Sequence, residues 1–327
     1  MSTLEKHLYG TDLFGESMRP PVTSPVAQKF LVPPFSVLNA REGDWQERKR
    51  AWAAMGIKPE ARKVTGKNCT TGKNSCMMTA LAASPHLQPE NGEEGGGVVS
   101  LFDPVLCELA YRWFSGEGAQ ILDPFAGGSV RGIVAAHLGR RYWGCDLRAE
   151  QIEANRAQGA ALCEGKSMPE WVCGDSMNEV EKAPEADFIF SCPPYGDLEQ
   201  YSDIREDLSA MPHKDFVIAY RTIIFRACKR LRENRFACFV VGDFRDGKGN
   251  YRNFVSETIA AFLDAGLSLY NEAILVTSVG SASMRVTRQF SAGRKLCKTH
   301  QNVLVFVKGD GRKAADICDS VLTKAKT

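Results

Sequence analysis

Hydrophobic positions follow two alternating patterns from Val98 onward. Short, nearly continuous apolar runs are typical of strands buried on both faces, and stretches with an apolar residue every three or four positions are typical of helices with one buried face. The runs that predict strands are AQILDPFAG, RYWGCDL, WVCGDSM, ADFIFSCPPY, RFACFVVGDF, LSLYNEAILVT and HQNVLVFVKG. The stretches that predict helices are VVSLFDPVLCELAYRWF, SVRGIVAAHLG, AEQIEANRAQGAAL, DFVIAYRTIIFRACKRL and FVSETIAAFLDAG. This alternation predicts an α/β fold, a Rossmann-like and mostly parallel seven-stranded sheet with helices on both faces.

The first 97 residues differ from the rest in composition. Prolines punctuate the early part and predict extended backbone, and WQERKRAWAAMG predicts a short basic helix in which core packing explains Trp45 and Trp52 better than stacking on a base. Residues 61–97 are rich in Lys, Gly, Asn and Ser and predict a flexible loop. We therefore expect an N-terminal extension over 1–97, one domain over 98–310 and a C-terminal tail over 311–327.

Composition excludes several classes of protein. Hydrophobic residues make up 44% and charged residues 24% of the 327 residues, as in soluble globular proteins, and no apolar run reaches the roughly 20 residues of a membrane-spanning helix. The N-terminus has no secretory pattern, so we expect a cytoplasmic protein without membrane contact. The 11 cysteines are an odd number without a CxxC pair, which argues against a full disulfide framework and predicts small reduced core residues at Cys145, Cys173, Cys228 and Cys238. Cys69 and Cys76 lack a second pair of ligands, so no metal site is expected.

Acidic residues and glycines end three consecutive predicted strands. Ligands of parallel sheets bind beyond the carboxyl ends of the strands, where carboxylates can accept hydrogen bonds from a ribose diol or an adenine amino group. A phosphate-binding loop would lack these acidic groups, so the pattern suits S-adenosylmethionine better than a dinucleotide. The alternative is that the aspartates are helix caps and turn formers. The predicted cofactor-binding residues are Asp123, Pro124, Phe125, Gly127, Gly128, Asp146 and Asp175.

A turn stiffened by two prolines follows the fourth predicted strand, in FSCPPYGDLEQYSD. This turn and DPFAGGS resemble the two hallmark motifs of the DNA amino-methyltransferases, which act on adenine N6 or cytosine N4. The segments PPFSVLNAREGDWQERKRAW, LYNEAILVTSVGS and KTHQNVLVFVKGD resemble DNA methylases of bacteriophages and prophages, and the likeness extends from Phe30 to Asp310. It implies an S-adenosylmethionine-dependent Rossmann-like methyltransferase that flips a DNA base into its pocket in a bacterial host cell.

The resemblance also implies roles for the turn, whose candidate catalytic residues are Ser191, Cys192, Pro193, Pro194 and Tyr195. Tyr195 would stack on the flipped base, and the Pro193 carbonyl would accept a hydrogen bond from the target amino group. The chain departs from the family at Cys192, where the family has Asp, Asn or Ser, and at Ser129, where it has a second glycine.

Three interpretations of Cys192 stay open. The cysteine is tolerated while backbone carbonyls hold the amino group, or Ser191 substitutes for it through a shifted backbone. Alternatively Cys192 is a nucleophile that attacks C6 of cytosine so that C5 is methylated, with Glu199 as a candidate base contact. The overall resemblance favours amino-methylation. An RNA methyltransferase and a non-catalytic DNA-binding relative are further alternatives.

Basic residues gather in residues 281–301, a predicted DNA-contact loop between the last two predicted strands. The segment carries Phe290 and His300 together with the predicted DNA contacts Arg285, Arg288, Arg294, Lys295 and Lys298. Cations mixed with an aromatic residue suit phosphate contacts and a wedge into the base stack, and the alternative is a solvated charged hairpin. A second DNA-facing surface is predicted from Arg48, Lys49, Arg50 and the TGKN repeats.

Overall fold

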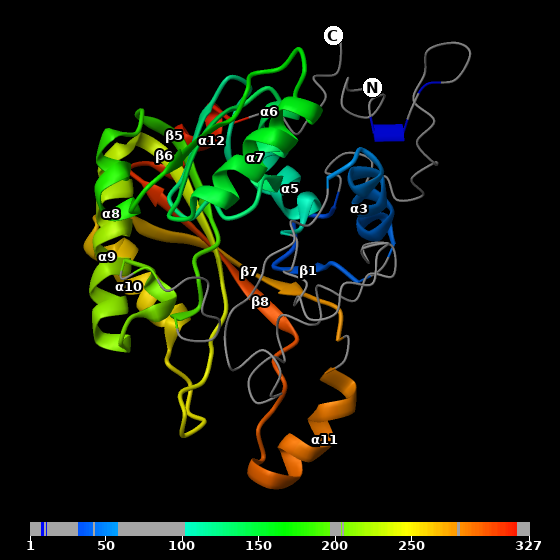
Figure 1. Ribbon diagram of the computed structural model, residues 1–327, viewed down its shortest axis with the longest axis vertical. Coiled ribbons are helices and arrows are strands. Elements are labelled where there is room, and N and C mark those ends of the chain that lie inside the picture. The colour runs from blue at the N-terminus through cyan, green and yellow to red at the C-terminus, as the bar shows by residue number, and fades with distance from the viewer. Residues whose placement is uncertain are drawn as a thin grey trace.

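An eight-stranded sheet with helices on both faces organises the chain (Figure 1). The computed structural model describes residues 8–9, 11, 32–41, 43–57, 102–196, 204, 206–279 and 282–318. The strands are β1 (Val37–Asn39), β2 (Gln120–Asp123), β3 (Arg141–Asp146), β4 (Glu170–Cys173), β5 (Ala186–Ser191), β6 (Leu231–Val241), β7 (Ser268–Val276) and β8 (His300–Lys308). The α-helices are α3 (Asp44–Ala54), α5 (Pro104–Phe114), α6 (Val130–His137), α7 (Ala149–Leu162), α8 (Ser176–Glu179), α9 (His213–Arg230), α10 (Phe254–Asp264), α11 (Ala282–Gly293) and α12 (Gly311–Asp316). Short 3₁₀ helices span Val180–Lys182 and Leu208–Ala210.

The strand order is β1-β7-β8-β6-β5-β2-β3-β4, and only β8 runs antiparallel to its neighbours among the described strands. The chain builds outward from β2 to β4, then returns to place β5 on the other side of β2. The order therefore reverses between β2 and β5, and a ligand crevice forms at such a switch point beyond the carboxyl ends of the strands. This arrangement confirms the predicted Rossmann-like, mostly parallel α/β fold.

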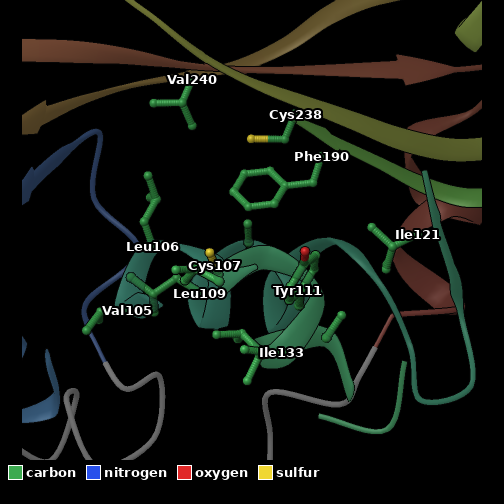
Figure 2. Packing of buried hydrophobic residues seen from close by; sticks show 14 of the residues in the cluster. Val105, Leu106, Cys107, Leu109, Tyr111, Ile121, Ile133, Phe190, Cys238 and Val240 are labelled. Atoms are coloured by element: carbon green, nitrogen blue, oxygen red, sulfur yellow. The ribbon is translucent and has the colours of Figure 1, made fainter. Parts of the chain in front are cut away.

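Alternating side chains of the central strands build two hydrophobic cores. Phe188 and Phe190 of β5 belong to the core under α5 and α6, whereas Ile189 belongs to the core under α9 and α10. Figure 2 shows the first core, in which residues of α5 such as Leu106 and Tyr111 lie opposite Phe190 and strand β6. Because successive strand residues point to opposite faces, a nearly continuous apolar run is what a sheet covered on both sides requires.

The eighth strand comes from the N-terminal part of the chain. β1 pairs in parallel with β7, with Val37 opposite Ile274 and Asn39 opposite Val276. Apolar periodicity predicts seven strands because a three-residue edge strand is too short to show a pattern of its own. Its pairing depends on the exposed edge of β7, a feature of the tertiary structure.

Helix α3 is docked on α5 by a buried polar cluster. Arg48 donates to both carboxylate oxygens of Glu108, over 2.9 and 2.6 Å, and the Trp52 indole donates to the same carboxylate over 2.9 Å. Lys49 pairs with Asp103 at 3.1 Å. Arg48 is buried in this ion pair, so the prediction that it faces DNA is wrong.

One further prediction for the N-terminal residues is confirmed, and another concerns residues that the structure does not describe. Trp45 and Trp52 are both buried, which confirms the prediction of core packing. The TGKN repeats, with Cys69 and Cys76, lie outside the described residues.

The cysteines of the two cores are free thiols. Burial raises the pKa of Cys145 and of Cys228 to about 12, so both stay protonated at neutral pH. Cys173 is exposed and its predicted burial is wrong, because it ends the edge strand β4. Cys297 is disulfide-bonded. Among the described helices, none has the length and apolar character to span a membrane.

Candidate active site

The carboxyl ends of β2, β3 and β5 bring residues from three separate motifs together. Asp123 ends β2, Asp146 ends β3 and Ser191 ends β5, and these strands are neighbours in the sheet. Pro124, Gly127 and Gly128 follow β2, and Pro193 and Pro194 follow β5, so the chain bends immediately beyond these two strand ends. A ligand site is therefore expected at this edge of the sheet.

Asp123 is the centre of a buried hydrogen-bond network. Its carboxylate is fully buried and accepts from the Arg131 guanidinium at 2.5 Å, the Tyr142 hydroxyl at 2.7 Å and the Ser191 hydroxyl at 2.5 Å. The backbone N–H of Phe125 also donates to it, over 3.2 Å. Four donors from the protein thus bind this carboxylate. Its role in this structure is to hold the turn after β2 against the end of β5.

Arg131 extends the same network to the backbone. The guanidinium donates to the carbonyls of Phe125 at 2.5 Å and Ala126 at 2.9 Å, and lies 4.7 Å from the ring centre of Phe102. Burial by itself would lower the pKa of Arg131, but the adjacent Asp123 carboxylate raises it above the ordinary value. A permanently charged arginine therefore fixes the turn from inside the protein.

Asp146 fixes the glycine turn through hydrogen bonds to the backbone. The N–H of Gly127 donates to one Asp146 oxygen over 3.1 Å and the N–H of Arg148 donates to the other over 3.0 Å. Asn155 donates to the Gly127 carbonyl over 2.7 Å, and Gly127 has a φ of +49°, which glycine adopts without strain. Gly127 and Gly128 are partly exposed, and 16% of the Asp146 side chain is exposed, so this part of the edge can reach a ligand.

Ser129 stands where the resembled family has a second glycine. Its side chain is buried and its hydroxyl donates to Gln158 of α7 over 3.3 Å. The hydroxyl therefore points toward α7. The Ser129 side chain, which glycine lacks, does not cover the partly exposed side of the turn.

Asp175 caps α8 and tightens the third strand end. Its carboxylate accepts from the N–H of Met177 over 2.8 Å, and the neighbouring Ser176 hydroxyl donates to the Pro124 carbonyl over 2.6 Å. This is the helix-cap interpretation of the aspartate. A contact of Asp175 with adenine stays a prediction.

The proline turn after β5 packs its aromatic residue against the protein. Only 6% of Tyr195 is exposed, its ring packs edge-to-face with Phe254 at 6.1 Å, and its hydroxyl accepts from Gln301 of β8 over 2.7 Å. Pro193 is buried and Pro194 half-exposed. The Tyr195 ring is packed inside the protein in this structure, so stacking on a base would require the ring to leave this position.

Cys192 is a neutral thiol next to Ser191, at the start of the proline turn. The side chain is half-buried, and its sulfur lies 3.9 Å from the Tyr195 hydroxyl. Burial raises the pKa of Cys192, and the opposing effect of Arg131 does not compensate, because that guanidinium is bound to Asp123. Ser191, the other candidate acceptor, is buried, and its hydroxyl donates a hydrogen bond to Asp123. Glu199 lies outside the described residues.

The basic segment between the last two strands contains helix α11, where the sequence predicts a loop. Arg288 and Arg294 are exposed and Lys295 is half-exposed, as phosphate contacts require. The side chain of Arg285 lies outside the described part. Contact of these residues with DNA stays a prediction.

Lys298 lies beside the last strand of the sheet and is half-buried. Its ammonium donates to Asn302 of β8 over 3.3 Å, and burial lowers the pKa of Lys298 although Asp243 and Glu272 oppose that effect. Burial and Lys298 together also lower the pKa of His300. A contact of Lys298 with DNA stays a prediction.

Sequence reasoning missed Arg131, Asn155 and Gln301. Arg131 interrupts the otherwise apolar α6, and a charge on a buried helix face is the one local signal that something pairs with it. Asn155 and Gln301 carry no such signal, since polar residues at those positions are equally typical of exposed surface.

Comparisons with known proteins find distant structural likeness. No family model and no curated protein matches the chain. TrmN from Thermus thermophilus is 18% identical, with 63% of this chain and 49% of TrmN covered and a TM-score of 0.43. Magnesium protoporphyrin IX methyltransferase from Synechocystis, with bound SAM, is 10% identical over 59% of this chain and 71% of that one, with a TM-score of 0.38. Precorrin-6y C5,15-methyltransferase from Geobacter metallireducens is 10% identical over 63% and 86%, with a TM-score of 0.40.

These likenesses concern part of the fold. The chain spans about half the length of TrmN. All three identities are below 25% and all three TM-scores below 0.5, so no function is transferred from these proteins to this chain. Among the residues that the structure describes, no cluster of three or more metal-ligating side chains occurs.

Proposed function

We propose that this protein is an S-adenosylmethionine-dependent methyltransferase that methylates an exocyclic amino group of a DNA base, adenine N6 or cytosine N4. One observation carries the proposal. The Ser191 hydroxyl binds the Asp123 carboxylate over 2.5 Å, and this bond joins the start of the proline turn to the glycine turn 68 residues earlier in the chain. A cofactor bound at the glycine turn would therefore lie next to a base bound at the proline turn.

The residues at the glycine turn fit the proposed cofactor. The Asp146 carboxylate, which is 16% exposed and paired with Arg148 at 3.6 Å, would accept from the ribose diol, and the partly exposed Gly127 and Gly128 allow close approach. When bound, S-adenosylmethionine would supply the activated methyl group.

The proline turn would hold and align the target amino group. The Pro193 carbonyl would accept one N–H, which directs the nitrogen lone pair at the methyl carbon. Methyl transfer from the bound donor would form the N–C bond as the S–C bond breaks with its electron pair going to sulfur, and the surplus proton of the amino group would pass to solvent. None of these steps needs a thiolate.

The neutral state of Cys192 supports amino-methylation over C5 methylation. A C5 enzyme needs the thiolate as its nucleophile, and burial raises the pKa of Cys192. The half-buried sulfur is instead suited to line the space beside the amino group.

Nucleoside mass spectrometry with retention standards tests the function. Purified protein is incubated with S-adenosylmethionine and DNA, and the DNA is digested to nucleosides. N6-methyladenine or N4-methylcytosine is the expected product. 5-Methylcytosine would make Cys192 the nucleophile, and methylation of RNA alone or of neither polymer would overturn the proposal.

Replacement of Cys192 should have a small effect on this activity. We expect Cys192→Ala and Cys192→Ser to keep kcat/KM within about tenfold of wild type, because no covalent bond to the thiol is required. The serine variant restores a side chain found in the resembled family and is expected to be the more active of the two. Loss of all activity in both folded variants, with wild type active, would contradict this assignment.

Replacement of Asp146 should weaken cofactor binding. Asp146→Ala removes a charged hydrogen-bond acceptor and is expected to raise the Kd for S-adenosylmethionine about tenfold to hundredfold in isothermal titration calorimetry. Asp146→Asn keeps an oxygen for the Gly127 N–H and should lose less. Asp215→Ala, an exposed change in the first turn of α9, is the matched control and should leave Kd unchanged. Equal affinity of all three variants would remove Asp146 from the site.

A further inference from the structure

A β-hairpin after β6 forms part of the surface beside the proline turn. Residues 244–252 fold back through an antiparallel bridge between Arg245 and Tyr251. The turn is closed by hydrogen bonds from the Asp246 N–H to the Asn250 carbonyl and from the Gly249 N–H to the Asp246 carbonyl, both 2.9 Å. The Asp246 carboxylate accepts the Asn250 N–H over 2.8 Å and so is held within the turn.

The hairpin touches the basic segment that follows α11. Gly249 has a φ of +92°, and a Cβ at this position would collide with Nζ and Cε of Lys295. The Lys295 side chain thus lies directly on the backbone of the hairpin turn. Figure 1 shows the hairpin, in yellow, and α11, in orange, projecting from the same end of the sheet.

The combined surface pairs cations with exposed aromatic rings. The Arg245 guanidinium lies 3.9 Å from the ring centre of Tyr251, and Arg294 lies 5.2 Å from that of Phe290. Tyr251 and Phe290 are each 41% exposed. Lys248 is exposed at the tip of the hairpin. We call these residues the hairpin surface: Arg245, Lys248, Tyr251, Phe290, Arg294 and Lys295.

The hairpin surface adjoins the candidate catalytic turn. Phe244, at the base of the hairpin, lies so close to Gly196 that a Cβ there would be 2.8 Å from its ring. Gly196 directly follows Tyr195, whose hydroxyl is bound by Gln301 of β8. A polymer chain lying across the hairpin would therefore run past the proline turn.

We infer that the hairpin surface binds the DNA strand next to the target base. Lys248, Arg245 and Lys295 contact phosphates because their side chains are cationic. Tyr251 stacks on an unpaired base or its sugar, because its ring is exposed and lies beside the Arg245 guanidinium. The six residues of the hairpin surface include four cations and no carboxylate, and the neighbouring Asp246 carboxylate is engaged in the turn. Arg245 also donates to the Gly249 carbonyl over 2.9 Å. The inference rests on the proposed function for the identity of the polymer. The hairpin itself was identified from the structure and not from a sequence motif.

Fluorescence anisotropy with a short labelled DNA duplex, without a methyl donor, tests the inference. Arg245→Ala/Lys248→Ala is expected to weaken binding about tenfold and to reduce the slope of log K against log salt by about 2. The matched control is Lys166→Ala/Lys229→Ala, which removes the same charge from exposed positions before β4 and at the end of α9. The control should keep wild-type affinity within about twofold. Lys248→Ala alone, at an exposed tip, should reduce the slope by about 1 and guards against misfolding of the double variant.

Tyr251 separates stacking from charge. Tyr251→Leu is expected to weaken binding of DNA with an unpaired target base about tenfold, and Tyr251→Phe should bind as wild type because the ring is kept. Similar losses in both variants would overturn the stacking role.

The outcomes distinguish this inference from the proposed function. If wild type methylates DNA and the Arg245→Ala/Lys248→Ala variant binds it as well as the control does, the inference fails and the proposed function stands. If DNA binding depends on the hairpin but no methylated base forms, the proposed function fails and the binding surface stands. Tighter hairpin-dependent binding of RNA than of DNA would overturn DNA as the partner.

Discussion

Arg131→Met is expected to lower the free energy of unfolding by about 3–5 kcal/mol, because the change leaves the buried Asp123 carboxylate without its charged partner. It also removes the donor that binds the carbonyls of Phe125 and Ala126. Urea unfolding followed by circular dichroism measures the change. Because the same guanidinium fixes the glycine turn, the folded variant should also bind S-adenosylmethionine more weakly than wild type.

The control for Arg131 is Arg141→Met, an exposed position at the start of β3. It should alter stability by no more than about 0.5 kcal/mol. The double variant Arg131→Met/Asp123→Asn should recover part of the loss, since it removes the unpaired charge as well. Losses of equal size in the two single methionine variants would show that the buried ion pair contributes nothing specific.

Glu108 should make stability depend on pH in the acid range. Burial by itself would raise the pKa of Glu108, but Arg48, Arg112 and the Trp52 indole lower it from 4.5 to about 2. A carboxyl whose pKa is lower in the folded state contributes stability above its unfolded pKa and loses it as the pH falls from about 4.5 toward 2. Each pH unit between the unfolded and folded pKa values corresponds to about 1.4 kcal/mol, so the full contribution is about 3 kcal/mol.

Glu108→Gln is therefore expected to be less stable than wild type by about 3 kcal/mol at pH 7, with the gap reduced by about 2 kcal/mol at pH 3. Urea unfolding of both proteins at several pH values gives the difference directly. Glu153→Gln, an exposed change on α7, should stay within about 0.5 kcal/mol of wild type at every pH. A gap that does not narrow in acid would contradict the ionic contact between α3 and α5.

The apolar pattern predicts the strands from β2 to β8, and β2, β3, β5, β6 and β8 are mostly buried as their apolar runs predict. β4 and β7 are largely exposed, so their predicted burial on both faces is wrong; β4 lies at the edge of the sheet and β7 is flanked only by the short β1 on one side. The chain from Gln120 to Lys308 alternates between runs that fit a sheet covered on both faces and stretches that fit an amphipathic helix. The proline turn and the acidic strand ends are also visible, since prolines and glycines constrain the backbone locally. The pattern does not predict α11, because basic residues between two strands are equally typical of a loop, although Ala282–Gly293 folds as a helix.

The candidate site shows what local patterns leave out. The sequence by itself determined the fold class, the order of the strands from β2 to β8 with the helices α5, α6, α7, α9 and α10 between them, and the strand-end positions of Asp123, Asp146 and Cys192. Only the tertiary structure decided that Asp123 is enclosed by Arg131 and Ser191, that Lys298 is half-buried beside β8 and that the hairpin lies against Lys295. These pairings join residues that are far apart in the chain or on different elements, and they form only when the packed sheet closes the intervening loops and buries the partners together.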